Sequence, residues 1–274
     1  MPFVQIRDIQ IYYEIHGKGR PPLLYISETG GDLRRRPNIF DSPLASHFEV
    51  LAYDQRGLGR SGRPDQPYTM TDYAEDAHAL LHALGWDRCA VMGVSFGGMV
   101  AQELALRYAD HVKRLVLACT SSGGAGGDSY PLHQLHGLSS KQKAARLIPL
   151  LDTRCDEAWQ ASHPGAYSAL VRRIISDMEI GADEPGREQG ARHQLEARIG
   201  HDTFERLPDL TMPVLICGGR YDAISPESNL RALDRHIRRS RLAFFEGGHR
   251  FLLQDERAFE HIGAFLKGQL DSTE

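Results

Sequence analysis

This sequence of 274 residues has few cysteines, and it lacks excess positive charge and long apolar runs. No apolar run approaches the roughly 20 residues that a membrane span needs, so no membrane association is expected. Basic residues number 32 against 36 acidic ones, and this balance argues against a generally basic nucleic-acid binder. The first 15 residues have neither a basic leader nor a small-residue cleavage site, so they predict a first strand rather than a signal peptide.

The few cysteines form no recognisable motif. None belongs to a Cys-x-x-Cys pair, which gives little support to a zinc site or a redox site. No disulfide framework is implied, and a cytoplasmic location fits such a chain. The four cysteines are Cys89, Cys119, Cys155 and Cys217.

Short apolar runs bounded by turn residues predict strands. Residues 3–7 and 10–16 alternate between apolar and polar side chains, as half-buried antiparallel strands do. Further runs are nearly continuous in apolar character, which is typical of strands covered on both faces. These runs are residues 22–27, 49–53, 89–94, 114–119 and 213–218, with 241–246 as a candidate last strand.

Helical patterns alternate with these strands. Residues 70–84 and 96–108 each place apolar side chains on one helix face, and Thr69 with Asp72 resembles a capping box. A last helix is expected near the C-terminus, with Asp255 and Glu256 in its first turn. Alternation of this kind predicts an α/β fold built on a doubly wound sheet.

The alternation breaks between residues 121 and 210. A glycine-rich opening is followed there by helical patterns at 139–151, 166–179 and 187–199, with no strand-like run. The insertion is too long for a loop, so we expect a helical cap laid over the sheet's carboxyl edge. The prediction is therefore a core of residues 1–120 and 211–274 with a cap of residues 121–210.

Residues 93–97 read Gly-Val-Ser-Phe-Gly between a predicted strand and a predicted helix. In that context the motif predicts a nucleophile elbow, in which Ser95 is held in a strained turn and small neighbours permit close packing. A serine hydroxyl needs a base, and the base needs an orienting acid. His249 follows the last predicted strand and Asp222 ends the turn after residues 213–218, so we expect Ser95, Asp222 and His249 to form a catalytic triad.

Four motifs spread over nearly the whole chain resemble the α/β-hydrolases of the capped esterase and lactonase group. They are GVSFGG at 93–98, DQRGLGRSG at 54–62, GGRYD at 218–222 and GGHRF at 247–251. The resemblance, somewhat closer to 3-oxoadipate enol-lactonases than to other relatives, implies a mostly parallel twisted sheet of about eight strands. It also implies helices on both faces and a cap inserted after strand 6. Carried over residue by residue, Ser95 is the nucleophile, His249 the base and Asp222 the orienter.

The resemblance also implies an oxyanion hole formed by two backbone N–H groups, those of Phe96 and Thr29. Here the sequence departs from the family, because Ser27 and Glu28 replace the usual His-Gly pair. A backbone donor does not depend on its side chain, so Thr29 can still serve. Glu28 is expected to face solvent or pair internally, with a role in substrate binding or proton transfer left open.

Other candidates for substrate binding are Arg34, in the basic run 34–36, and the aromatic side chains of Trp159 and Phe251. Arginines suit a carboxylate-bearing substrate, although charge runs are mostly solvated and aromatic residues in helices are mostly core.

The expected function is a serine hydrolase that cleaves a small carboxylic ester or lactone, without metal or organic cofactor. One alternative is a carbon–carbon bond hydrolase of vinylogous diketo acids, which uses the same triad. Another is a small-ligand receptor that keeps the triad but turns over slowly. The sequence leaves the substrate and the oligomeric state open.

Overall fold

A single eight-stranded sheet organises residues 2–270, which are the residues that the computed structural model describes. Its spatial order is β1-β2-β4-β3-β5-β6-β7-β8. The β1–β2 and β2–β4 pairs are antiparallel and every other pair is parallel, as expected for a mostly parallel sheet. The strands are β1 (Phe3–Ile6), β2 (Ile9–His16), β3 (Pro22–Ile26), β4 (Glu49–Tyr53), β5 (Cys89–Val94), β6 (Val112–Ala118), β7 (Val214–Gly219) and β8 (Ser240–Phe245).

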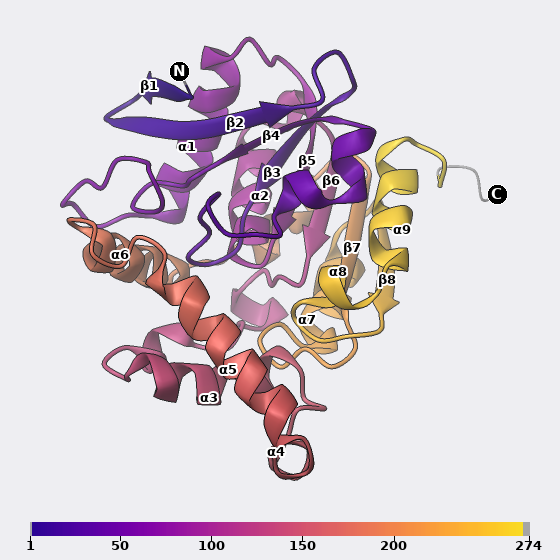
Figure 1. Ribbon diagram of the computed structural model, residues 1–274. Coiled ribbons are helices and arrows are strands. Elements are labelled where there is room, and N and C mark those ends of the chain that lie inside the picture. The colour runs from indigo at the N-terminus through magenta and orange to yellow at the C-terminus, as the bar shows by residue number, and fades with distance from the viewer. Residues whose placement is uncertain (1, 271–274) are drawn as a thin grey trace.

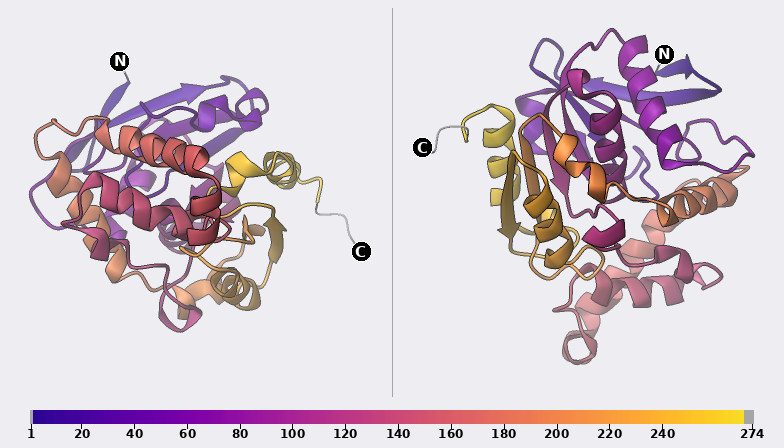
Figure 2. Two further views of the ribbon diagram at one scale, coloured as in Figure 1. Left: turned by 60° about the horizontal axis from the view of Figure 1, so that its bottom comes forward. Right: turned by 180° about the vertical axis from the view of Figure 1, so that it is seen from behind.

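Helices cover both faces of this sheet (Figure 2). The first face carries α1 (Met70–Ala83), α2 (Phe96–Arg107) and α7 (Glu227–His236), whose buried side chains join one apolar cluster with the strands. The second face carries α8 (Phe251–Gln254) and α9 (Arg257–Leu266), which belong to a second cluster. Central strands β5 and β7 are buried along their whole length, which explains why their sequences are continuously apolar.

The N-terminus of α1 is formed as the sequence predicts, whereas the N-terminus of α9 differs from the prediction. The predicted capping box of α1 is present, with Thr69 accepting from the N–H of Asp72. Asp255, expected in the first turn of the last helix, instead precedes α9. Its carboxylate accepts from the N–H groups of Glu246 and Arg257, and this double contact separates α9 from the short helix α8.

Between β6 and β7 the described chain forms helices and no strand. The α-helices are α3 (Ser140–Leu151), α4 (Glu157–Ser162), α5 (Pro164–Glu179) and α6 (Arg187–Ile199), and short 3-10 helices occur at Gly124–Gly126, Leu132–Leu135 and Phe204–Asp209. Three correspond to the predicted helical patterns, whereas α4 was not predicted because six residues hold too little periodicity. Figure 1 shows α3, α4 and α5 beyond one end of the sheet, and α3 and α5 share a small apolar cluster of their own. None of the helices within residues 2–270 combines the length and the apolarity needed to cross a membrane.

Candidate active site

The turn between β5 and α2 holds Ser95 in an unusual backbone conformation. Its φ is 54° and its ψ is −116°, a combination that non-glycine residues rarely adopt. Glycines make the turn possible: a Cβ on Gly93 would lie 2.2 Å from the carbonyl oxygen of Gly97, and one on Gly97 would lie 2.1 Å from that of Ile26. The strained strand–turn–helix expected from the sequence is therefore present.

Three side chains that are far apart in the sequence meet at this turn. The His249 Nε2 atom lies 3.0 Å from Ser95 Oγ, and His249 Nδ1 lies 2.7 Å from Asp222 Oδ2. The Asp222 side chain is fully buried and that of His249 is 10% exposed. This is the spacing at which an imidazole can take a proton from the hydroxyl while the carboxylate fixes its tautomer.

The loop after β7 aims the Asp222 carboxylate. Its Oδ1 atom accepts hydrogen bonds from the N–H groups of Ile224 and Ser225, at 2.8 and 3.0 Å. Those two bonds leave Oδ2 directed at His249, so the turn both holds and orients the carboxylate.

The end of α3 contacts both loops that carry the acid and the base. The carbonyl oxygen of Leu150 accepts from the N–H of Ala223 at 3.1 Å, and that of Leu151 accepts from the N–H of His249 at 2.6 Å. The N–H of Thr153 donates to the carbonyl oxygen of Tyr221 at 2.9 Å. Sequence reasoning missed these contacts, because backbone hydrogen bonds between distant segments leave no residue-type signal.

The two predicted oxyanion donors belong to the start of α2 and to the loop after β3. Phe96 is the first residue of α2, so its N–H has no acceptor within the helix. Thr29 lies in the loop after β3, and among the bonds of residues 2–270 none uses its N–H. The next residue, Gly30, donates its N–H to Gln194 Oε1 of α6 at 2.7 Å. No sequence motif pointed to Gln194.

The two charged candidates, Arg34 and Glu28, both interact with other groups of the protein. Arg34 forms ion pairs with Asp32 and with Glu184. Burial, followed by the charge of Glu28, raises the pKa of the Tyr25 phenol well above its usual range, and Glu28 also contributes to the raised pKa of Cys119. Glu28 therefore lies on the side of Tyr25 and Cys119, and its part in the chemistry stays a prediction.

The two aromatic candidates have packing partners within the protein. Trp159 stacks on His163 in the region of α4, with ring centroids 5.0 Å apart. Phe251 has no exposed surface and stacks on Phe245 in the second core cluster. The placement of Phe251 agrees with the core interpretation, whereas Trp159 is only partly buried and belongs to none of the apolar clusters of the described residues. A contact with substrate remains a prediction for each.

One group of potential metal ligands occurs among the described residues, and it overlaps the site. Atoms of Cys119, Asp222 and His249 lie within 4.8 Å of one another. Burial first, and then the charge of Asp222, raises the pKa of the Cys119 thiol well above its usual range. A protonated thiol is a poor ligand, so the group suits the Asp222–His249 hydrogen bond better than a metal ion.

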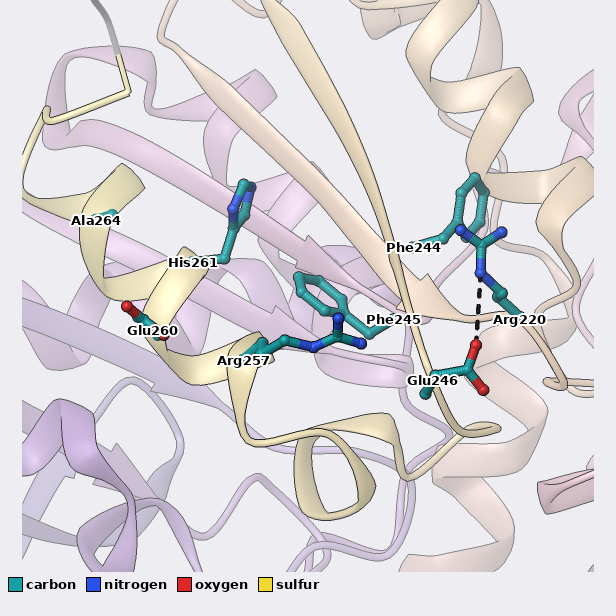
Figure 3. Close-up of a pocket in the computed structure, with 8 residues that line it drawn as sticks. All are labelled: Arg220, Phe244, Phe245, Glu246, Arg257, Glu260, His261 and Ala264. Carbon is teal, nitrogen blue, oxygen red and sulfur yellow. Dashed lines mark ion pairs between the residues drawn. The ribbon is translucent and has the colours of Figure 1, made fainter.

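A separate hollow of about 580 Å³ lies at the outer edge of the sheet, between β8 and α9 (Figure 3). Arg220 and Glu246 face each other across one side of it at 3.9 Å. Its lining residues are not among the site residues predicted from the sequence.

Known proteins resemble this chain over nearly its whole length. Residues 28–154 match a family model described as the alpha/beta hydrolase fold. The "Putative carbamate hydrolase RutD" of Azorhizobium caulinodans is 30% identical, over 99% of this chain and 100% of that protein. The "3-oxoadipate enol-lactonase 2" of Acinetobacter baylyi is 23% identical, over 95% and 94%. The solved enol-lactonase from Burkholderia xenovorans LB400 superposes with a TM-score of 0.74 at 22% identity, covering 98% of both chains.

Proposed function

Because the chain belongs to the α/β-hydrolase superfamily and is a hydrolase, we propose that it cleaves a small carboxylic ester or lactone with Ser95 as nucleophile. The observation that carries this proposal is the chain of contacts from Asp222 to His249 to Ser95, at 2.7 and 3.0 Å. The loops that follow β5, β7 and β8 supply these residues at one edge of the sheet.

In the first half-reaction, Ser95 Oγ attacks the substrate carbonyl carbon while its proton passes to His249 Nε2. The positive imidazolium is stabilised by Asp222, and the negative oxygen of the tetrahedral intermediate is stabilised by the N–H groups of Phe96 and Thr29. Collapse of the intermediate breaks the bond to the leaving oxygen, which takes the proton from His249. The product of this half is an ester between Ser95 and the acyl group.

In the second half-reaction, His249 removes a proton from water, which attacks the acyl carbon. The tetrahedral intermediate reforms and collapses, the proton returns to Ser95 Oγ, and the carboxylic acid leaves. A lactone opens in the same way, except that its leaving alcohol stays attached to the acyl group.

A fluorophosphonate probe tests the nucleophile directly. We expect one equivalent of label on Ser95, located by mass spectrometry, with loss of ester hydrolysis. Ser95→Ala should abolish labelling and lower kcat roughly 10⁴- to 10⁶-fold while the unfolding temperature stays close to wild type. Ser162→Ala, an exposed serine of α4, is the matched control and should label normally. Label on another residue, or none, would contradict the proposal.

A substrate panel separates the remaining alternatives. It comprises lactones, short esters, thioesters, carbamates and dienoic diketo acids, because relatives carry the names carbamate hydrolase and enol-lactonase. Turnover of the diketo acids with indifference to esters would favour the carbon–carbon bond hydrolase. A single slow turnover with a ligand-dependent change in hydrogen exchange of residues 121–210, the proposed cap, would favour the receptor.

A further inference from the structure

A threonine that follows β6 binds the main chain of the turn that carries Ser95. The hydroxyl of Thr120, two residues beyond the end of β6, donates to the carbonyl oxygen of Ser95 at 2.7 Å. Thr120 has no exposed surface. A buried hydroxyl needs an acceptor, and the acceptor it takes here belongs to the residue proposed as nucleophile. The bond therefore couples a buried side chain at the edge of the sheet to the proposed catalytic turn.

The turn is fixed to the sheet on both sides of Ser95. The N–H of Ser95 donates to the carbonyl oxygen of Ala118, the last residue of β6, at 2.8 Å, and the carbonyl of Ser95 accepts from Thr120. A rare backbone conformation persists only where surrounding contacts hold it. The same carbonyl also accepts from the N–H groups of Gly98 at 2.9 Å and Met99 at 3.3 Å, but these belong to α2 and move with it. The contact with Thr120 fixes the carbonyl relative to β6.

Thr120 is itself held in place from two sides. The N–H of Cys119 donates to the carbonyl oxygen of Cys217 in β7 at 2.8 Å, which ties the segment after β6 to the next strand. Thr120 also packs against α2, because a Cβ added to Gly98 would lie 2.6 Å from its Cβ and 2.7 Å from its Cγ2 and Oγ1. With neighbours this close, the side chain has little room for another rotamer. Its hydroxyl therefore stays directed at the carbonyl of Ser95.

The peptide group that Thr120 binds also carries the proposed oxyanion donor. The carbonyl of Ser95 and the N–H of Phe96 belong to one trans peptide, which is planar, so its C=O and N–H point in opposite directions. A partner that fixes the oxygen therefore fixes the direction of the N–H as well. Hydrogen bonds in series also polarise one another, so donation to the oxygen makes the N–H a stronger donor.

We propose that Thr120 is a positioning residue for the oxyanion hole. Its hydroxyl holds the peptide between Ser95 and Phe96 so that the N–H of Phe96 meets the negative oxygen of the tetrahedral intermediate. The inference rests on the proposed function and deepens it, because it assigns the hole a supporting side chain from the segment after β6. Negative charge on that oxygen develops only during the reaction, so the hydroxyl of Thr120 stabilises the transition state more than the bound ester.

Two substitutions separate the hydroxyl of Thr120 from the volume of its side chain. Thr120→Val keeps the shape and removes the donor, whereas Thr120→Ser keeps the donor and removes a methyl group. With p-nitrophenyl butanoate as the probe, we expect Thr120→Val to lower kcat about tenfold or more with KM within about twofold of wild type, since removal of a direct oxyanion donor costs about 10²- to 10³-fold. Thr120→Ser should keep a kcat close to wild type even if its unfolding temperature falls.

Thr203→Val is the matched control. Thr203 is also buried, and its hydroxyl donates to Gln102 Oε1 at 2.7 Å rather than to the peptide after Ser95. We expect it to lower the unfolding temperature about as much as Thr120→Val does, with kcat unchanged. The rate of inactivation by a fluorophosphonate is a second measurement that needs no ester substrate, because the phosphonyl oxygen occupies the same hole. This rate should fall in Thr120→Val and not in Thr203→Val.

Failure of this inference and failure of the proposed function give different results. If Ser95 of the wild type takes no fluorophosphonate, the serine mechanism is wrong and the role of Thr120 is overturned with it. If the wild type is labelled and Thr120→Val keeps the wild-type kcat and inactivation rate, only the role of Thr120 is refuted.

Packing alone would give a third pattern. Equal losses of kcat in Thr120→Ser and Thr120→Val, or in Thr120→Val and Thr203→Val, would overturn the inference, because they would not depend on the hydroxyl that contacts Ser95. If Thr120→Val does not fold, Thr120→Ala takes its place, since it differs from Thr120→Ser by the hydroxyl alone. Equal inactivation rates of Thr120→Ala and Thr120→Ser would then refute the role of the hydroxyl.

Discussion

At the scale of single residues, buried polar groups divide into those with partners and those without. Asp222 uses both carboxylate oxygens, whereas Gln194 and Thr29 each leave one atom unpartnered. His201, which follows α6, is a third case: its Nε2 lies 3.3 Å from the carbonyl oxygen of Ser121 and its Nδ1 has no partner within residues 2–270. Burial lowers the pKa of His201 to about 4.

This shift predicts a loss of stability in mild acid. The unfolded chain takes up a proton on His201 below its usual pKa of about 6.5, whereas the folded protein does so only near 4. Stability is therefore lost as pH falls through this window, by about 2 kcal/mol at about pH 5. Denaturant unfolding of wild type and His201→Gln should reveal this as a difference that grows on acidification.

His47→Gln is the control, because His47 is exposed and should show no such growth. The pH dependence of stability must be compared between wild type and the variants, because Asp54 changes the stability of every one of these proteins in the direction opposite to His201. Burial raises the pKa of Asp54 to about 6, so its protonation favours the folded state in acid. A parallel pH dependence of wild type and His201→Gln would contradict the interpretation.

At the scale of elements, α3 and α8 are joined through Asp152 close to the base. The Asp152 Oδ2 atom accepts from Gln254 Nε2 at 2.9 Å, and Gln254 Oε1 accepts from the N–H of Gly248 at 2.9 Å. Gly248 precedes His249, so the end of α3 helps to set where the imidazole lies. Burial acts to raise the pKa of Asp152, but hydrogen bonds led by Arg154 outweigh it and the pKa is lowered.

Asp152→Ala should therefore affect turnover more than substrate binding. Loss of the contact to Gln254 frees the His249 loop, and we expect kcat to fall roughly ten- to hundredfold with a small change in KM. Steady-state kinetics checks this. Asp156→Ala removes the N-cap of α4 and should leave kcat unchanged, so equal effects of both variants would point to general destabilisation instead.

At the scale of the whole molecule, α6 reaches the sheet through a contact between two glycines. A Cβ on Gly190 would lie 2.0 Å from the carbonyl oxygen of Gly57, which belongs to the turn after β4. No larger side chain fits without moving α6 away from that turn. The same helix carries Gln194, so this close approach also sets its distance from the loop after β3.

Gly190→Ala should consequently lower the unfolding temperature by several degrees and reduce ester hydrolysis. Alanine favours a helix by about 1 kcal/mol over glycine, but the backbone clash outweighs this gain. Gly200→Ala is the matched control, because a Cβ there meets nothing within 4 Å and its φ is −92°. Calorimetry of both variants measures the unfolding temperatures. An unchanged unfolding temperature in Gly190→Ala would contradict the prediction, because it would show that α6 can move away from Gly57 without loss of stability.

The sequence by itself determined the strands, most helices and the turn at Ser95, because burial on two faces, helical periodicity and glycine sterics are local properties of the chain. It also singled out Asp222 and His249, since the carboxyl ends of parallel strands must meet at one edge. Only the tertiary structure decided that the end of α3 hydrogen-bonds to the His249 loop and that Gln194 accepts a hydrogen bond from Gly30. Those contacts join backbone groups and a common polar side chain across 98 and 164 positions, and no local pattern encodes which distant partner they meet.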